Sequence, residues 1–133
     1  MTHEILQPAG WMRPRGYSNG IAASGRQIFV SGQIGWDAHC RLVSERLSAQ
    51  VHQALANIVA VLGTAGARPE HVVRLTWFVT SRAEYLAEVR DVGAAYREVF
   101  GRHFPAMSVV EVSALVESGA KVEIEATAVV PQE

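Results

Sequence analysis

The stretch that decides the fold is Phe104-Pro105-Ala106-Met107-Ser108-Val109-Val110-Glu111-Val112, followed by Lys121-Val122-Glu123-Ile124-Glu125-Ala126-Thr127-Ala128-Val129-Val130. Both segments are rich in β-branched residues, which favour strands. In the second segment apolar and polar residues alternate, as expected for a strand with one buried face. We therefore predict two strands at the end of the chain, joined by a loop through Glu117-Ser118-Gly119.

Two helices are predicted upstream of these strands. The first is an amphipathic helix whose apolar residues recur at spacings of three and four: Leu47, Val51, Leu55, Ile58 and Leu62. Gly63 or Gly66 would end it. The second begins with the capping-box pattern Ser81-Arg82-Ala83-Glu84 and ends at Gly101. Between them, Val72–Thr80 is rich in β-branched and aromatic residues and predicts a strand.

The first part of the chain predicts short strands between loops. His3–Gln7 alternates weakly and predicts a short strand, whereas the prolines and glycines of Pro8–Gly20 predict a loop. Ile21–Ala23 and Gln27–Val30 predict two further strands. The turn residues Ser24-Gly25-Arg26 between these two strands suggest that they form a hairpin.

Taken together, these elements predict an α+β fold, a mixed sheet with two helices on one face. The length of 133 residues is enough for one domain, which we place at residues 1–133. Two helices can cover only one face of such a sheet. The other face would stay partly exposed unless another subunit covers it, so the pattern argues for an oligomer.

Composition excludes several classes of function. With 12 basic and 13 acidic residues, the chain lacks the charge that binds nucleic acid or anionic lipid. Cys40 is the only cysteine, and the five histidines lack metal-ligand spacing, so we predict no disulfide, no metal and no cofactor. No apolar run reaches the roughly 18 residues of a membrane helix, and the N-terminus has no leader pattern. We predict a cytoplasmic protein with neither a nucleic-acid nor a membrane partner.

Five segments, taken together and in order, carry a family resemblance. The chain resembles the RidA (YjgF, endoribonuclease L-PSP-like) family of small imine/enamine deaminases from about residue 13 to residue 130. The resemblance implies a chorismate-mutase-like fold assembled as a homotrimer, with the sheets in a central barrel and three small-molecule clefts between subunits. The segments are Gly16-Tyr17-Ser18-Asn19-Gly20, Val30-Ser31-Gly32-Gln33-Ile34, Gln53-Ala54-Leu55-Ala56-Asn57-Ile58, Phe104-Pro105-Ala106-x-Ser108 and Val122-Glu123-Ile124-Glu125-Ala126.

The resemblance also implies which residues form the site. In the active branch of the family, an arginine after Phe-Pro-Ala holds the substrate carboxylate, and an acidic residue on the last strand positions water. The imine carbon is then hydrolysed to a 2-keto acid and ammonia. Glu123 matches the acid, Tyr17 the loop tyrosine, and Ser31 the serine beside the Gly32 backbone, but Met107 stands in place of the arginine.

The departures from the family pattern leave alternatives open. Losing an Arg–carboxylate pair removes about 1.5–3 kcal/mol of binding, so ordinary imino acids should bind poorly. Met107 would then either fill a vestigial cleft or line a pocket for a different substrate. Arg13 or Arg15 could replace the missing anchor, although solvated loop arginines are the alternative reading. Gly93 stands where the family often has an asparagine.

The leading hypothesis is an imine/enamine deaminase that acts on a non-standard substrate. In it Glu123 activates water, while Tyr17, Ser31, Gly32 and the two residues Met107 and Arg15 contact the ligand. A non-catalytic ligand-binding or regulatory protein is the second hypothesis, in which Glu123 would belong to a solvated strand face. An endoribonuclease or translation-inhibitor role is the third, and the near-neutral charge argues against it.

Overall fold

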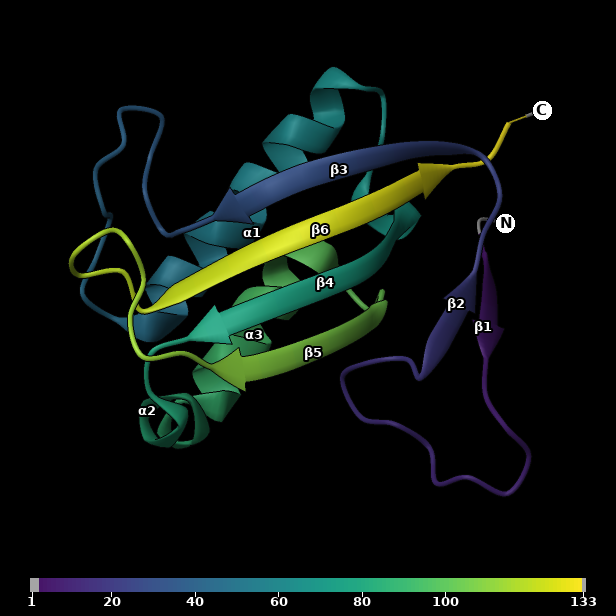
Figure 1. Cartoon of the computed structure of the whole chain (residues 1–133), viewed down its shortest axis with the longest axis horizontal. Coiled ribbons are helices and arrows are strands. Elements are labelled where there is room, and N and C mark those ends of the chain that lie inside the picture. Colours follow the sequence, from purple (N-terminus) through teal and green to yellow (C-terminus); the bar gives the residue numbers. More distant parts are fainter. Residues whose placement is uncertain (1–2, 133) are drawn as a thin grey trace.

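The computed structural model describes residues 3–132. A mixed four-stranded sheet has the order β3-β6-β4-β5, in which only the β4–β5 pair is parallel, and β1 and β2 form a separate antiparallel pair. Figure 1 shows the two long helices behind one face of the larger sheet and the β1–β2 pair beside it. The elements are β1 (Glu4–Leu6), β2 (Gly20–Ala22), β3 (Arg26–Gln33), α1 (Leu47–Thr64), the 3₁₀ turn η1 (Pro69–His71), β4 (Val72–Val79), α2 (Arg82–Ala87), α3 (Val89–Phe100), β5 (Ala106–Glu111) and β6 (Val122–Val130).

The α+β fold with helices on one face is therefore confirmed, as are the helix start at Ser81 and the helix end at Gly101. The predicted capping box is only half formed, because the Glu84 carboxylate accepts a hydrogen bond from Lys121. Ser81 caps α2 by accepting a hydrogen bond from the backbone N–H of Glu84 at 3.0 Å. Gly101 ends α3 in the left-handed region, with φ of 65°. The predicted second helix is interrupted at Glu88, which separates α2 from α3.

The predicted hairpin between Ile21–Ala23 and Gln27–Val30 is wrong. β2 pairs with β1, and β3 pairs with β6 over most of its length. At Gly25 the chain passes so close to the backbone at the end of β6 that a Cβ would overlap the carbonyl oxygen of Val130. The Ser24-Gly25-Arg26 segment therefore carries the chain into the larger sheet and does not fold it back.

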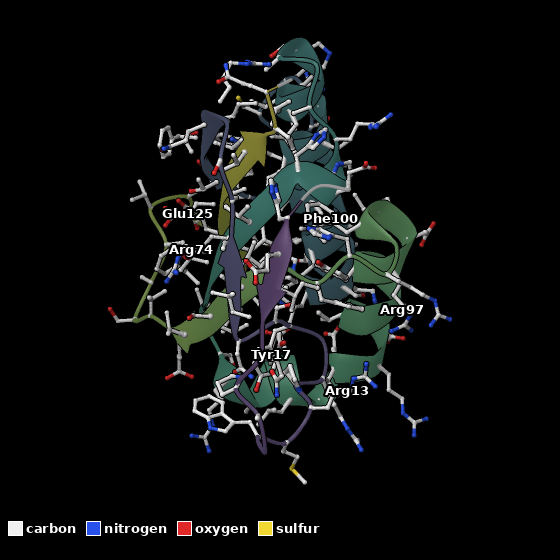
Figure 2. The ribbon with its side chains drawn as sticks, turned by 90° about the vertical axis from the view of Figure 1, so that its right-hand side faces the viewer. Arg13, Tyr17, Arg74, Arg97, Phe100 and Glu125 are labelled. Atoms are coloured by element: carbon white, nitrogen blue, oxygen red, sulfur yellow. The ribbon has the colours of Figure 1, made fainter. Side chains whose placement is uncertain are left out.

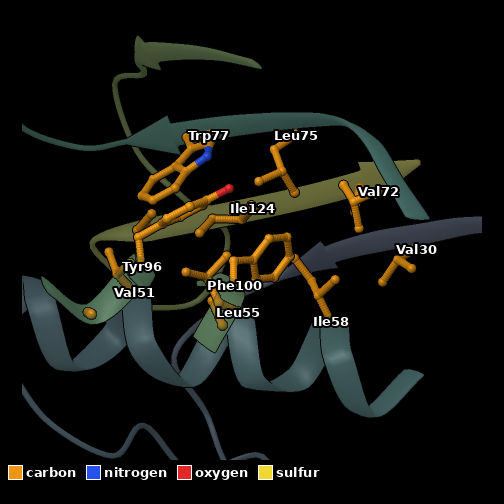
Figure 3. Packing of buried hydrophobic residues seen from close by; sticks show 14 of the residues in the cluster. Val30, Val51, Leu55, Ile58, Val72, Leu75, Trp77, Tyr96, Phe100 and Ile124 are labelled. Carbon is orange, nitrogen blue, oxygen red and sulfur yellow. The ribbon is translucent and has the colours of Figure 1, made fainter. Parts of the chain in front are cut away.

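The hydrophobic core lies between α1, α3 and the covered face of the sheet (Figure 3). Leu55 and Ile58 of α1 are fully buried against this face, as are Leu75 of β4 and Ile124 of β6. Each fully buried side chain of this kind contributes about 1.5–3 kcal/mol of hydrophobic stabilisation. The predicted inward set of β6 (Val122, Ile124, Ala126 and Ala128) is buried throughout.

The opposite face of the sheet has no helix over it, as predicted. We call it the open face. It includes the side chain of Phe29, which is 71% exposed, and a hollow of about 390 Å³ formed by residues of three strands, among them Arg74 and Glu125. Figure 2 shows Arg74 and Glu125 on the side of the sheet away from α3. None of the helices in the described part of the chain is long and apolar enough to cross a membrane.

Candidate functional site

The N-terminal loop is attached to the start of β5 through Ser18. The backbone N–H of Ser18 donates to the carbonyl of Pro105 at 3.1 Å, and its buried hydroxyl donates to the carbonyl of Phe104. An isolated bridge to Ala106 extends this contact. The attachment holds Arg15 and its neighbours beside β5. The sequence reasoning did not single out Ser18 as this anchor, although Ser18 lies within one of the five family segments.

Next to this attachment is a cavity of about 300 Å³, which we call the α3–β5 cavity. Met107 of β5 lines it together with Arg15 of the loop, so the structure brings these two predicted residues together. Gly93 lines the same cavity. The rest of its wall is mainly apolar and aromatic, with one further arginine: Gly16, Trp77, Tyr85, Val89, Val92, Tyr96, Arg97, Phe104 and Val109.

The aromatic wall of the α3–β5 cavity is stacked and uncharged. Tyr96 packs against Trp77 and Phe104, with ring centroids 6.3 and 5.5 Å apart. Burial raises the pKa of the Tyr96 phenol and, to a lesser extent, that of Tyr85, so both stay neutral at physiological pH. The Tyr96 hydroxyl donates to the carbonyl of His103, which fixes the ring. The charged groups that line this cavity are therefore the guanidinium groups of its arginines.

Tyr17 lies beside the α3–β5 cavity and does not line it. Its ring is 42% exposed and borders a neighbouring hollow of about 340 Å³ with Arg13 and Phe104. Phe104 forms part of the wall of both spaces. Figure 2 shows Tyr17 and Arg13 in the same loop, at the end of the molecule beyond the sheet. The proposed ligand contact of Tyr17 stays a prediction, as does an anchoring role for Arg13.

Ser31, Gly32 and Glu123 form a second group, which we call the Glu123 group. A Cβ on Gly32 would lie 2.7 Å from Cδ and 2.8 Å from Cγ of Glu123, so the glutamate side chain lies directly over this glycine. Gln33 donates to the backbone carbonyl of Ser31 at 3.2 Å. Within residues 3–132 the Glu123 carboxylate accepts no hydrogen bond and forms no salt bridge, so it is available to a ligand or to water.

The two groups lie on opposite faces of the sheet. Met107 pairs with Leu75, whose side chain points into the core, whereas Glu123 pairs with Phe78, which points to the open face. β4 separates β5 from β6, so the two backbones are about 10 Å apart across the sheet and a further 10 Å or so along it. One small ligand cannot touch both groups of a single chain.

Adding a methyl group at Gly32 should disturb the Glu123 group. We expect Gly32→Ala to lower the free energy of unfolding by about 0.5–1.5 kcal/mol, because the new methyl group forces the Glu123 side chain out of its present rotamer. Chemical denaturation would measure it, and Gly32→Ala combined with Glu123→Ala should recover most of the loss. Gly63→Ala is the control for adding a methyl group where a Cβ meets no atom within 4 Å, and inside α1 it should stabilise the protein slightly. Equal stability of Gly32→Ala and wild type would contradict this packing.

No metal site is apparent in the part of the chain that the structure covers. Within residues 3–132, no three His, Cys, Asp or Glu side chains gather as a metal ion would require. Cys40 is exposed.

Three comparisons with known proteins bear on this geometry. A family model described as endoribonuclease L-PSP matches residues 12–130. The chain is 39% identical over 108 residues to a 2-iminobutanoate/2-iminopropanoate deaminase of Salmonella typhimurium, covering 79% of this chain and 80% of the relative. The crystal structure of the Rid family protein YyfB of Yersinia pestis matches with a TM-score of 0.86 and 34% identity, over 98% of this chain and 100% of that one. The YjgF structure of Escherichia coli matches with a TM-score of 0.68 and 36% identity, over 85% and 87% of the two chains.

The fold and the two groups define a small α+β protein with an apolar cavity on one side of its sheet and a carboxylate on the other. With the matches above, the class is that of the Rid proteins. The chain belongs to the RidA/YjgF family.

Proposed function

We propose that this protein is a hydrolytic imine/enamine deaminase that acts in clefts between the subunits of a cytoplasmic homotrimer. The observation that carries the proposal is the Glu123 carboxylate, which lies over Gly32 with no charged partner among the described residues. The name of the Salmonella relative, a 2-iminobutanoate/2-iminopropanoate deaminase, supports the same chemistry.

In the proposed reaction, the Glu123 carboxylate takes a proton from a water molecule as that water attacks the imine carbon. Glu123 returns this proton to the imine nitrogen, which gives a neutral carbinolamine. The carboxylate then takes the proton of the carbinolamine hydroxyl and passes it to the nitrogen as the C–N bond breaks, so that ammonia leaves a carbonyl product. The hydroxyl of Ser31 and the backbone N–H of Gly32 would position the imine beside the water. One imine and one water thus give one carbonyl compound and one ammonia, with no net transfer of electrons.

The division of the site between two faces supports assembly. A ligand near Met107 reaches a carboxylate only if a second copy places its own Glu123 group there. The exposed aromatic and polar side chains of the open face offer a surface for such packing. A cyclic trimer would complete three equivalent clefts.

The residue at position 107 determines which substrate class we propose. Met107 lines the α3–β5 cavity where the active branch of the family has an arginine, so the side chain at this position offers no charge for a small substrate carboxylate. The proposed substrate is therefore not the usual short-chain 2-imino acid. The same observation favours a second candidate, a non-catalytic protein that binds a small apolar ligand in this cavity.

We expect Met107→Arg to increase the hydrolysis of small 2-imino acids by about 10- to 100-fold, because it restores a charge-assisted hydrogen bond to the carboxylate. An amino-acid oxidase would generate the imine in place, and semicarbazide would trap whatever is not hydrolysed. Wild type and Met107→Arg would be compared with Val116→Arg, which adds an arginine at a fully exposed loop position outside the cavity.

The outcomes separate the two candidates. Wild-type turnover of any imine supports the deaminase. An inactive wild type that Met107→Arg does not rescue would overturn the proposed chemistry and favour the binding protein.

A further inference from the structure

The α3–β5 cavity has two arginines from different elements on a wall that is otherwise apolar. Arg15 comes from the N-terminal loop and Arg97 from α3. Within residues 3–132, neither forms a salt bridge or a side-chain hydrogen bond. Among the arginines that the structure describes, only Arg46 and Arg68 form salt bridges, so what sets Arg15 and Arg97 apart is that both line one cavity. Two like charges at one cavity repel each other, and an anion between them removes that repulsion.

Gly93 creates the space that the Arg97 side chain uses. The two residues are one helical turn apart on α3, so they share a face of the helix. A Cβ at position 93 would lie 3.2 Å from Nη1 of Arg97. The guanidinium group of Arg97 therefore extends back over Gly93, beside the cavity that Met107 also lines. A larger side chain at position 93 would push this guanidinium group away.

We propose that the α3–β5 cavity binds the carboxylate of an apolar ligand, with Arg97 as its main anchor and Arg15 as a second contact. The inference rests on the proposed function, for which it names the substrate class: 2-imino acids with an aromatic or large branched side chain. The anchor has moved from the strand, where Met107 now stands, to the neighbouring helix.

The shape and chemistry of the cavity fit this class. A guanidinium group binds a carboxylate with two parallel hydrogen bonds, which a lysine cannot reproduce. Tyr96 and Phe104 offer aromatic surface for the apolar part, and Met107 offers an adaptable thioether. A volume of about 300 Å³ lies at the small end of the roughly 300–1,000 Å³ that small-molecule pockets occupy.

The test uses phenylpyruvate, the stable 2-keto product of this substrate class, titrated into the purified protein by calorimetry. We expect Arg97→Gln to raise the Kd by about 10- to 100-fold. Arg97→Lys should raise the Kd less, because lysine keeps the charge but not the two parallel hydrogen bonds. Arg15→Gln should have a smaller effect than Arg97→Gln. The matched control is Arg90→Gln, because Arg90 is exposed on the same helix and does not line the cavity. The control should bind as wild type does.

The phenylpyruvate methyl ester, which lacks the charge, should bind wild type about as weakly as phenylpyruvate binds Arg97→Gln. Equal Kd values for Arg97→Gln and Arg90→Gln would overturn the inference, and so would a wild-type protein that does not bind phenylpyruvate.

A second measurement separates this inference from the proposed function. It compares the phenylpyruvate affinities of wild type and Arg97→Gln with their rates of imine turnover, measured by semicarbazide competition. Binding that depends on Arg97 in a protein that turns over no imine would support the cavity and overturn the deaminase. Turnover that survives Arg97→Gln with unchanged KM would support the deaminase and overturn the anchor.

Discussion

Replacing Glu123 with glutamine is expected to lower kcat for imine hydrolysis by about 10²- to 10⁴-fold, the usual contribution of a general base. The amide has nearly the same shape as the carboxylate but cannot accept a proton from water. Because Glu123 is only half-buried and lacks an ion pair among residues 3–132, the substitution leaves no partner uncompensated, and stability should change little. Semicarbazide competition gives the activity, and thermal unfolding gives the stability.

Glu125→Gln is the control for this substitution. Glu125 lies two residues along β6 on the same open face, so both variants remove one negative charge from one surface. We expect Glu125→Gln to keep the activity within a few-fold of wild type. If both variants lose activity equally, the effect comes from the charge of the open face, and Glu123 is not the base.

Replacing Phe29 with glutamate is expected to dissociate the proposed homotrimer into monomers and to abolish the proposed deamination. A phenylalanine ring that is 71% exposed in one chain would bury much of the 150–250 Å² typical of an aromatic side chain in the assembly. A carboxylate in its place would lose its hydration on assembly, which costs several kcal/mol at each of three interfaces. Sedimentation velocity should show a wild-type species near three times 14.5 kDa and a variant near 14.5 kDa.

Val61→Glu is the control for assembly. Val61 is an exposed apolar residue of α1, on the other side of the molecule from the open face, so a charge there should leave the trimer intact. A wild-type protein that sediments as a monomer would contradict the proposed assembly, and with it any cleft between subunits.

Sequence alone predicted the elements whose residues repeat regularly. The alternation along β6 and the apolar stripe of α1 each identify the element and its buried face, because both patterns depend only on local geometry. The pairing of β3 was not predictable in this way. The turn residues near Gly25 suggested a local hairpin, whereas β3 in fact pairs with β6, about 100 residues later in the chain.

The candidate site was predictable in part. The family segments pointed to Met107 and Glu123, and Arg15 was suggested as a substitute anchor from its place in the loop before Tyr17. The structure places Met107 and Arg15 in one cavity. That Glu123 lies on the other face follows from the register of two strands against β4, which no single segment encodes. Arg97 was missed because its relation to the cavity depends on the space left by Gly93, which exists only once α3 packs beside β5.

The placement of Met107 and Glu123 on opposite sides of the sheet has a consequence for inheritance. Under the proposed assembly, each catalytic cleft is formed by two neighbouring chains, and one chain by itself cannot form it. A chain defective at Glu123 still carries an intact α3–β5 cavity, and a chain defective in the cavity still carries an intact Glu123. In a cell that expresses both defective copies equally, about one cleft in four would combine the two intact halves. Two alleles that are each null alone would then complement each other.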